Sequence, residues 1–348
     1  HYYLGNLLYD KKRPLDAIKH WEAARSVNAN FATVHRNLSL AYFNVLGDAE
    51  KSLASLENAF TCNQFDARVL FELDQLYKKL GYTPEKRLNK LKSYLDLVEQ
   101  RDDLFLEYIT LLNIVGHYDT SIDLLSNCIF HPWEGGEGKV TGQYVLAHVE
   151  LGKRYLAKED YQPAIQLFEK ALTYPHNLGE GKLAGAQENN IYYYLGIAYE
   201  GLNQMHQAME CFTIASKGLE EPTSAMYYND QPPEMIYYQG LAWRKLKNEK
   251  EAKRRFNKLV DYAEKHIFDD VVIDYFAVSL PDFLVFEDDL NKRNQIHCLY
   301  MRALGLMGLN QFNLAQEQFY QVLHLDPNHQ GAIIHKSLLK EEIPHESI

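Results

Sequence analysis

Two stretches of this chain repeat the same residue types at the same spacing, 44 residues apart. In each stretch a Leu-Gly pair is followed by Tyr, Ala, Phe and Ala at offsets of 4, 13, 17 and 20 from the Leu. The matching residues are Leu151, Gly152, Tyr155, Ala164, Phe168 and Ala171, and then Leu195, Gly196, Tyr199, Ala208, Phe212 and Ala215. Small residues let two helices cross closely, while the larger side chains fill the space around the crossing. Each stretch therefore predicts a helical hairpin, and such hairpins must stack because one alone cannot bury its apolar stripe.

This spacing resembles the tetratricopeptide repeat. The resemblance implies an all-α fold, a right-handed superhelix (α-solenoid) of about eight tetratricopeptide-like hairpins with inserted segments. The small residue of the second helix can be followed along the chain at intervals of 35, 34, 35, 43, 44, 44 and 63 residues. Its positions are Ala17, Ser52, Lys86, Ser121, Ala164, Ala208, Ala252 and Ala315.

The change of interval divides the chain. Residues 1–129 contain hairpins of regular period, some of which match the repeat pattern only in part. Residues 130–342 contain hairpins with longer junctions and form one continuous array with the first part. Residues 343–348 form a tail. The spacing within each hairpin stays constant, so the extra length of roughly 9, 10, 10 and 29 residues lies between hairpins. In a stacked array these junctions emerge at one edge, where we expect them to meet and to form a binding site. The last junction is long enough for an additional helix.

The inserted segments are rich in acidic and aromatic residues. Gly-Glu-Gly-Lys occurs in the first two, but neither Lys is followed by Ser or Thr, which argues against a phosphate-binding loop. One interpretation is that the glycines simply turn the chain back into the next helix. The other is that carboxylates and aromatic rings present themselves to a polar ligand. The candidates from these segments are Trp133, Glu134, Glu137, Glu180, Tyr227, Tyr228, Asp230 and Asp282.

Matched positions of the first helix supply a second set of candidates. Two positions of this helix would face the concave groove of the array, and in three consecutive hairpins they carry polar and aromatic side chains. The polar set is Asn190, Glu234 and His297, and the aromatic set is Tyr193, Tyr237 and Tyr300. We expect these six residues to form the floor of the cleft that the inserted segments line.

Charge and hydropathy exclude two classes of partner. The formal net charge of −11 argues against nucleic acid, because binding to a phosphate backbone needs a clustered basic face. The most basic run, Arg244 to Arg255, is interrupted by Glu249 and Glu251, so we interpret it as a solvated helix face. No run of about 18 apolar residues is present, so we expect no segment that spans a membrane.

The cysteines and histidines indicate no metal site and no cofactor. The four cysteines lie apart, in no paired motif, which fits packing roles in a reduced compartment and leads us to expect a cytoplasmic protein. None of the 14 histidines forms a helical pair with a third ligand nearby. The chain begins with His1 inside a repeat helix, so we interpret it as part of a longer polypeptide, for which an upstream signal peptide stays open.

Three strings carry a narrower resemblance: HPWEGGEGK, YYNDQPPE and DYFAVSLPDF. Together they resemble the helical carboxyl-terminal region of bacterial multidomain proteins whose amino-terminal part is β-rich and of unknown function. This resemblance implies an upstream domain in the same polypeptide and a carbohydrate context. It implies no reaction.

Two functions from different classes follow. The first is a non-catalytic scaffold that holds a protein, a peptide or its own upstream domain in the groove and the cleft; it assigns no catalytic residue. The second is a carbohydrate-binding or carbohydrate-processing region, with a glycan as ligand. Glycoside cleavage needs two carboxylates about 5 to 10 Å apart as acid and base. For that second function the carboxylates would come from Glu134, Glu137, Glu180, Asp230 and Glu234.

Overall fold

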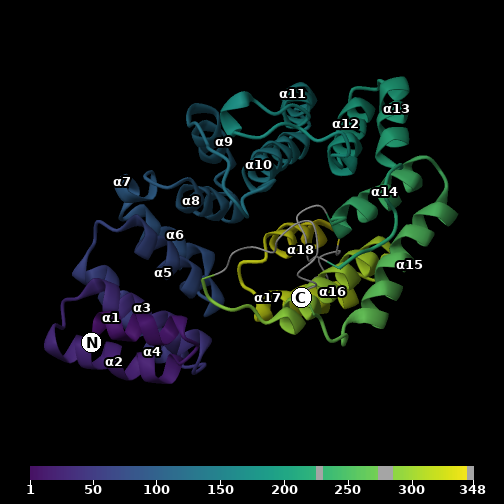
Figure 1. Ribbon diagram of the computed structural model, residues 1–348. Helices are drawn as coiled ribbons and strands as arrows, with labels where there is room; N and C mark the ends of the chain where they lie inside the picture. The colour runs from purple at the N-terminus through teal and green to yellow at the C-terminus, as the bar shows by residue number, and fades with distance from the viewer. Residues whose placement is uncertain (225–229, 273–284, 343–348) are drawn as a thin grey trace, which may run out of the picture. The chain divides into compact units, whose positions relative to one another are not determined.

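The computed structural model describes residues 1–224, 230–272 and 285–342 (Figure 1). Within these residues it contains 18 α-helices and one short 3₁₀ helix, and no strand. Fourteen of the α-helices pack as seven hairpins, and α8 and α9 follow one another across a short turn as an eighth pair. In each hairpin the first helix is here called helix A and the second helix B. The expected fold class, an all-α array of helical repeats, is confirmed. The chain divides into two compact units, and the boundary between Leu111 and Leu112 falls inside a helix.

Unit 1 comprises residues 1–111 together with 285–288 from much later in the chain. Its hairpins are α1/α2, α3/α4 and α5/α6, followed by the short α7 and by α8, which crosses the boundary. The bounds are α1 Tyr2–Asp10, α2 Pro14–Val27, α3 Ala32–Asn44, α4 Ala49–Cys62, α5 Ala67–Lys79, α6 Pro84–Lys92, α7 Leu95–Val98 and α8 Asp102–Ile114.

Unit 2 contains the remaining described residues. After α9, which pairs with α8 in sequence, come the hairpins α10/α11, α12/α13, α14/α15 and α16/α17, and then a last single helix, α18. The bounds are α9 Tyr118–Asn127, α10 Lys139–Leu156, α11 Tyr161–Ala171, η1 His176–Leu178, α12 Asn189–Gly201, α13 Met205–Ala215, α14 Pro233–Lys245, α15 Glu249–His266, α16 Leu290–Gly308, α17 Phe312–Leu325 and α18 Gln330–Glu342. The additional helix expected between α15 and α16 falls largely on residues 273–284, outside the described residues.

All eight hairpins turn in the same way. In each turn one residue adopts a left-handed conformation, with φ between 59° and 85°, and it lies five positions before the small residue followed in the sequence. The turn residues are Lys12, Gly47, Gly81, Gly116, Glu159, Asn203, Lys247 and Asn310. A left-handed residue reverses the chain tightly after helix A, and glycine adopts this conformation without strain. The turn therefore occupies the same position in all eight repeats.

The crossing of helix A and helix B is closed by an aromatic ring against a glycine. A Cβ atom added to Gly152 would collide with the ring of Phe168, and one added to Gly196 would collide with that of Phe212. The same contact joins Gly240 to Phe256 and Gly5 to Trp21, always 16 residues apart. The alanines at the crossings, Ala164 and Ala208 among them, are fully buried as expected. These four hairpins thus depend on the absence of a side chain at one position.

The third hairpin replaces this apolar crossing by a buried ion pair. Arg87 and Asp74 are 1% and 2% exposed, and the Arg87 Nε donates to the Asp74 Oδ1 over 3.0 Å. The same guanidinium donates to Glu107 from α8 over 2.9 Å. The sequence register assigned the buried position to Lys86, but Lys86 is exposed and its neighbour Arg87 lies inside. A buried charge needs close partners, and the two carboxylates supply them.

Substitution of the crossing glycine should destabilise unit 2. We expect Gly152→Ala to lower the free energy of unfolding by roughly 1 to 3 kcal/mol, because the new methyl group overpacks the contact with Phe168. The measurement is urea unfolding followed by circular dichroism. Gly142→Ala in the same helix is the matched control, since nothing lies within 4 Å of its added Cβ. Equal stability of the two variants would contradict this description of the crossing.

Candidate functional site

The A helices of unit 2 form a face that the chain itself covers. Figure 1 shows α10, α12, α14 and α16 curving around α18, with the B helices on the outside. The first residue of α18, Gln330, and Gln143 of α10 exchange amide hydrogen bonds of 3.0 and 3.1 Å. His335 of α18 contacts Tyr238 of α14 and Tyr300 of α16. The last helix of the chain therefore lies on the inner face of the preceding hairpins.

A chain of hydrogen-bonding side chains runs across this face. The hydroxyls of Tyr194 and Tyr238 lie 3.2 Å apart, and the Tyr238 hydroxyl lies 3.4 Å from the Nε2 of His335. The Nδ1 of His335 lies 2.8 Å from the carbonyl of Gly331, to which an N–H would donate. We assign the neutral tautomer with the proton on Nδ1, because Nε2 can then accept from Tyr238. At the other end, Lys153 donates to Glu150 over 2.8 Å and lies over the ring of Tyr194.

Burial shifts the titration of several groups on this face. Burial, and to a smaller extent the charge of Lys153, lower the pKa of His335 to about 3. The pKa values of Tyr238 and Tyr300 are raised, mainly because burial disfavours the phenolate. Burial also raises the pKa of Glu234, although a hydrogen bond from Tyr300 opposes the shift. The face is therefore polar in composition but carries few charges at neutral pH.

The six groove candidates lie on or beside this face. Tyr237 and Tyr300 are buried, each with its ring 5.9 Å from that of His335. The half-buried Tyr193 packs against Tyr238 with ring centroids 5.7 Å apart. The half-buried Glu234 bonds to Tyr300, as described above.

The other two groove candidates also lie on A helices of this face, but the hydrogen bonds of their side chains go to groups outside α18. His297 is buried, and its Nε2 lies 2.8 Å from the carbonyl of Thr223 in the third inserted segment. Asn190 is half-buried, and its side chain accepts from the amide of Ile191.

The first two inserted segments meet, and Glu180 joins them. Its carboxylate accepts from the amide of Gly138 with both oxygens at 3.0 Å and from the hydroxyl of Thr141 at 3.2 Å. A carboxylate at this position satisfies a free amide and complements the positive end of the α10 helix dipole. The second Gly-Glu-Gly-Lys sequence thus caps the helix that follows the first.

The remaining insertion candidates differ in exposure. Glu134 and Glu137 are exposed. Trp133 is half-buried, and its indole covers Gly136 so closely that an added Cβ there would collide with it. Asp230 is half-buried, and its charge acts on His297. The candidates Tyr227, Tyr228 and Asp282 lie outside the described residues.

Three asparagines that the sequence reading did not single out link the inserted segments to helix ends. The Asn177 amide donates to the carbonyls of Leu125 and Cys128 at the end of α9, and Asn189 donates to those of Ala215 and Lys217 at the end of α13. Asn294 donates to the carbonyl of His266 at the end of α15. Each satisfies carbonyls that a helix end leaves free. Asn177 precedes an A helix, whereas Asn189 and Asn294 lie in the first two turns of one, so their common signal is an Asn near the start of an A helix.

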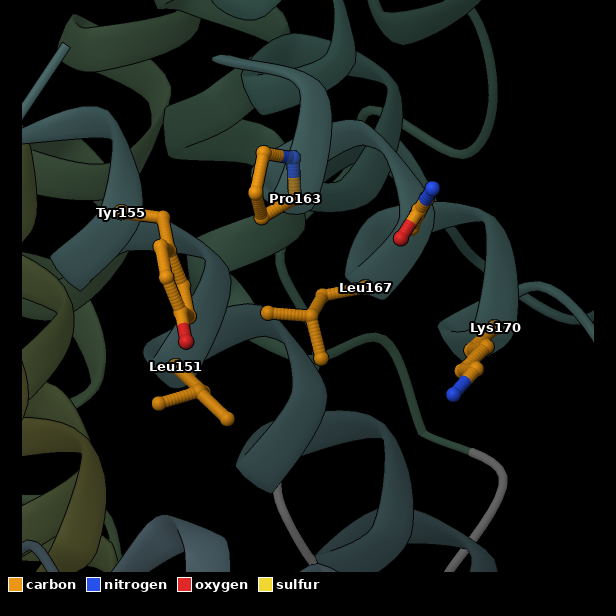
Figure 2. A pocket seen from close by; sticks show the side chains of 6 residues that line it. Leu151, Tyr155, Pro163, Leu167 and Lys170 are labelled. Atoms are coloured by element: carbon orange, nitrogen blue, oxygen red, sulfur yellow. The ribbon is translucent and has the colours of Figure 1, made fainter. Parts of the chain in front are cut away.

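Two shallow hollows open on unit 2. One, of about 190 Å³, lies between α10 and α11 and is lined by Leu151, Tyr155, Pro163 and Leu167, with Lys170 at its rim (Figure 2). The equivalent of Leu151 in the next hairpin, Leu195, is covered by α11 and only 4% exposed. The other hollow, of about 350 Å³, lies at the edge of the inserted segments.

The second hollow combines polar backbone with apolar side chains. It is bounded by residues 185–189, by Tyr192 and by the end of the α13 hairpin around Ile214 and Leu219. Ile214 and Leu219 are 46% and 63% exposed. An apolar patch beside a polar loop is suited to contact with a peptide or another protein surface.

Metal-binding clusters and membrane helices are both missing from the described part of the chain. No group of three or more His, Cys, Asp or Glu side chains is arranged to hold a metal ion. No described helix combines the length and the apolar character needed to cross a bilayer.

The basic run of α15 is paired with carboxylates. Arg254, Arg255 and Lys258 all contact Glu220. Arg255 is 5% exposed, so our interpretation of the run as a solvated face is wrong for this residue. The pairing arises because the third inserted segment brings Glu220 alongside the helix.

Comparison with known proteins supports the repeat at one hairpin. Residues 234–265, which form most of α14 and α15, match the family described as Tetratricopeptide repeat.

Solved structures with similarity to the chain include MamA, with 18% identity over 53% of this chain and 89% of MamA and a TM-score of 0.36. YrrB, described as a TPR protein with an unusual peptide-binding site, is 19% identical over 49% of this chain and 82% of its own, with a TM-score of 0.35. A tetratricopeptide repeat protein from Parabacteroides merdae is 12% identical over 89% and 98% of the two chains, with a TM-score of 0.42.

Removal of the Glu180 carboxylate should weaken the start of α10. We expect Glu180→Ala to reduce the free energy of unfolding by about 1 kcal/mol, the usual effect of losing a helix cap. Glu137→Ala in the matching loop is the control, because Glu137 is exposed and its loss should change stability by less than about 0.5 kcal/mol. The two variants are compared by thermal unfolding. A neutral effect of Glu180→Ala would leave this carboxylate free for a ligand.

Acid should destabilise unit 2 through His335. In the folded protein the pKa of this group is about 3, against 6.5 as its ordinary value, so the unfolded chain takes up the proton first. Stability is therefore fully present above about pH 6.5 and is lost as the pH falls towards 3, by at most about 1.4 kcal/mol per pH unit. We expect His335→Gln to reduce this slope, measured by urea unfolding at pH 7, 6 and 5. His206→Gln, on a side chain 84% exposed, should leave it unchanged.

Proposed function

We propose that this chain is a protein-binding scaffold, and that the inner face of the unit 2 A helices holds a helical segment of a partner protein. One observation supports this proposal above the others: the same face already binds a helix, α18, through side chains of α10, α14 and α16. Helical repeats stack their hairpins so that the A helices present a continuous surface, which suits an elongated ligand.

The contacts of α18 indicate what such a segment should contain. Gly331 lies against the Tyr300 hydroxyl so closely that a Cβ atom would collide with it. His335, one helical turn further, fits between Tyr238 and Tyr300. Ala332 and Leu339 are buried in the apolar core. A matching ligand therefore combines a small residue, a hydrogen-bonding residue four positions later and an apolar side.

Asn190, Tyr193 and Glu234 remain half-buried at the margin of this face. We propose that a partner contacts these three residues first, and that the exposed edge formed by the inserted segments extends the contact. A further domain of the same polypeptide is a second candidate for this position, in keeping with the narrower sequence resemblance.

The test is a selection of displayed peptides on the full chain. Peptides of 16 residues are selected on the wild-type protein, and their affinities are then measured by fluorescence anisotropy. We expect Asn190→Arg to weaken the selected peptides at least tenfold, because it places a long charged side chain at the margin of the face. His206→Arg adds the same charge on the outer helix α13 and should leave the affinities unchanged.

Two outcomes would contradict the proposal. Peptides that bind both variants equally would use another surface, and failure to select any peptide, together with binding on a glycan array, would favour the carbohydrate alternative. Both variants are first checked for an unchanged melting temperature.

A further inference from the structure

We infer that unit 1 carries a second recognition site, separate from the A-helix face of unit 2, for a short protein segment in which an aromatic residue is followed two positions later by a carboxylate. In this structure residues 285–288, Val-Phe-Glu-Asp, occupy that site. The occupant we propose in trans is a partner protein with the same order of residue types.

One side chain, that of Asn44, forms hydrogen bonds with the backbone of the bound segment. Asn44, the last residue of α3, donates from its Nδ2 to the carbonyl of Val285 over 2.9 Å, and its Oδ1 accepts from the amide of Glu287 over 2.9 Å. This pair of bonds engages the groups on both sides of Phe286 and leaves its side chain free to point into the protein. An amide that pairs with the backbone fixes the register of an extended segment without regard to its sequence.

The aromatic residue provides the apolar anchor. Phe286 is 1% exposed, and its ring packs edge-on against Phe43 with centroids 5.1 Å apart. Full burial of a Phe side chain contributes about 1.5 to 3 kcal/mol, and most short-segment recognition depends on such an anchor. Phe43 and Asn44 are neighbours on α3, so the anchor and the backbone contact are placed by one helix end.

The third contact is an ion pair, which selects a negatively charged residue in the bound segment. Lys79, the last residue of α5, lies 3.0 Å from the Asp288 carboxylate, and both side chains are partly buried. Glu287, between the anchor and this ion pair, is exposed. The site therefore specifies the aromatic residue and the carboxylate two positions later, and it tolerates variation between them.

The position of the segment in the sequence favours recognition over ordinary loop packing. Val285 follows Asn44 by 241 positions, and the chain up to residue 282 and from residue 289 onwards belongs to unit 2. The contacts use a tetrapeptide without regular secondary structure and the last residues of two helices, α3 and α5. A segment from another protein can present the same groups.

The test uses a fluorescein-labelled peptide, Leu-Val-Phe-Glu-Asp-Asp-Leu, and the full chain. In the variant Phe286→Ala/Asp288→Ala, called the vacated chain, the internal segment loses its anchor and its charge. We expect the vacated chain to bind the peptide, measured by anisotropy, at least tenfold more tightly than the wild type, because a tethered segment competes at an effective concentration in the millimolar range. Its fold is checked by its circular dichroism and melting temperature.

Further substitutions in the vacated chain separate the three contacts. Asn44→Asp retains the size of the side chain but loses the donor, and should weaken the peptide at least tenfold. Lys79→Met should do the same, whereas Lys79→Arg should retain binding. A peptide with Ala in place of Phe should not bind. Asn190→Arg in unit 2 should have no effect, which distinguishes this site from the proposed face of unit 2.

The inference is overturned if the folded vacated chain does not bind the peptide at millimolar concentration. It is also overturned if a scrambled peptide of the same composition binds equally well, because the attraction would then be a general one for acidic chains. Equal affinity of the Asn44→Asp variant would show that the backbone contact selects nothing.

Discussion

The structure depends first on the contact between an aromatic ring of helix B and the bare backbone of helix A. Where Gly152 meets Phe168, or Gly240 meets Phe256, the two helices approach as closely as a single ring allows. This contact fixes how closely helix A and helix B approach within the hairpin, whereas the left-handed turn residue recurs at one position in all eight repeats. The third hairpin retains the turn, but its two helices are joined by the ion pair of Asp74 and Arg87. The position of the turn is therefore kept where the apolar contact is absent.

These features could be predicted from the sequence because they are local. The residues that define a hairpin lie within about 20 positions of each other, so their spacing is visible in one chain. The insertions, too, were located correctly between hairpins. The function of single residues inside them was harder to predict. The same sequence allows Glu180 to contact a ligand or to cap a helix that begins 42 positions earlier. The two roles can be distinguished only when the position of Gly138 relative to Glu180 is known.

The two surfaces proposed for binding have no such local signal. The groove residues Tyr237 and Tyr300 were expected to be an open floor, but His335, which packs between them, lies in a helix that the repeat pattern does not require. No sequence pattern predicts that Asn44 contacts Val285, 241 positions later. In both cases the chain supplies a segment that covers its own surface. A repeat signature predicts where such a surface lies, but not which part of the same chain occupies it.

The contacts of α18 also change how this array should fold. In an open solenoid each repeat touches only its neighbours, so the ends unravel independently and folding can begin anywhere. In unit 2 the reciprocal amide bonds between Gln143 and Gln330 connect residues 187 positions apart, in α10 and in the last helix, α18. Closing that contact requires all intervening hairpins to be in place. We therefore expect unit 2 to unfold with the cooperativity of a globular domain, to fold more slowly than an open array and to resist fraying at its ends, although it is built from a linear repeat.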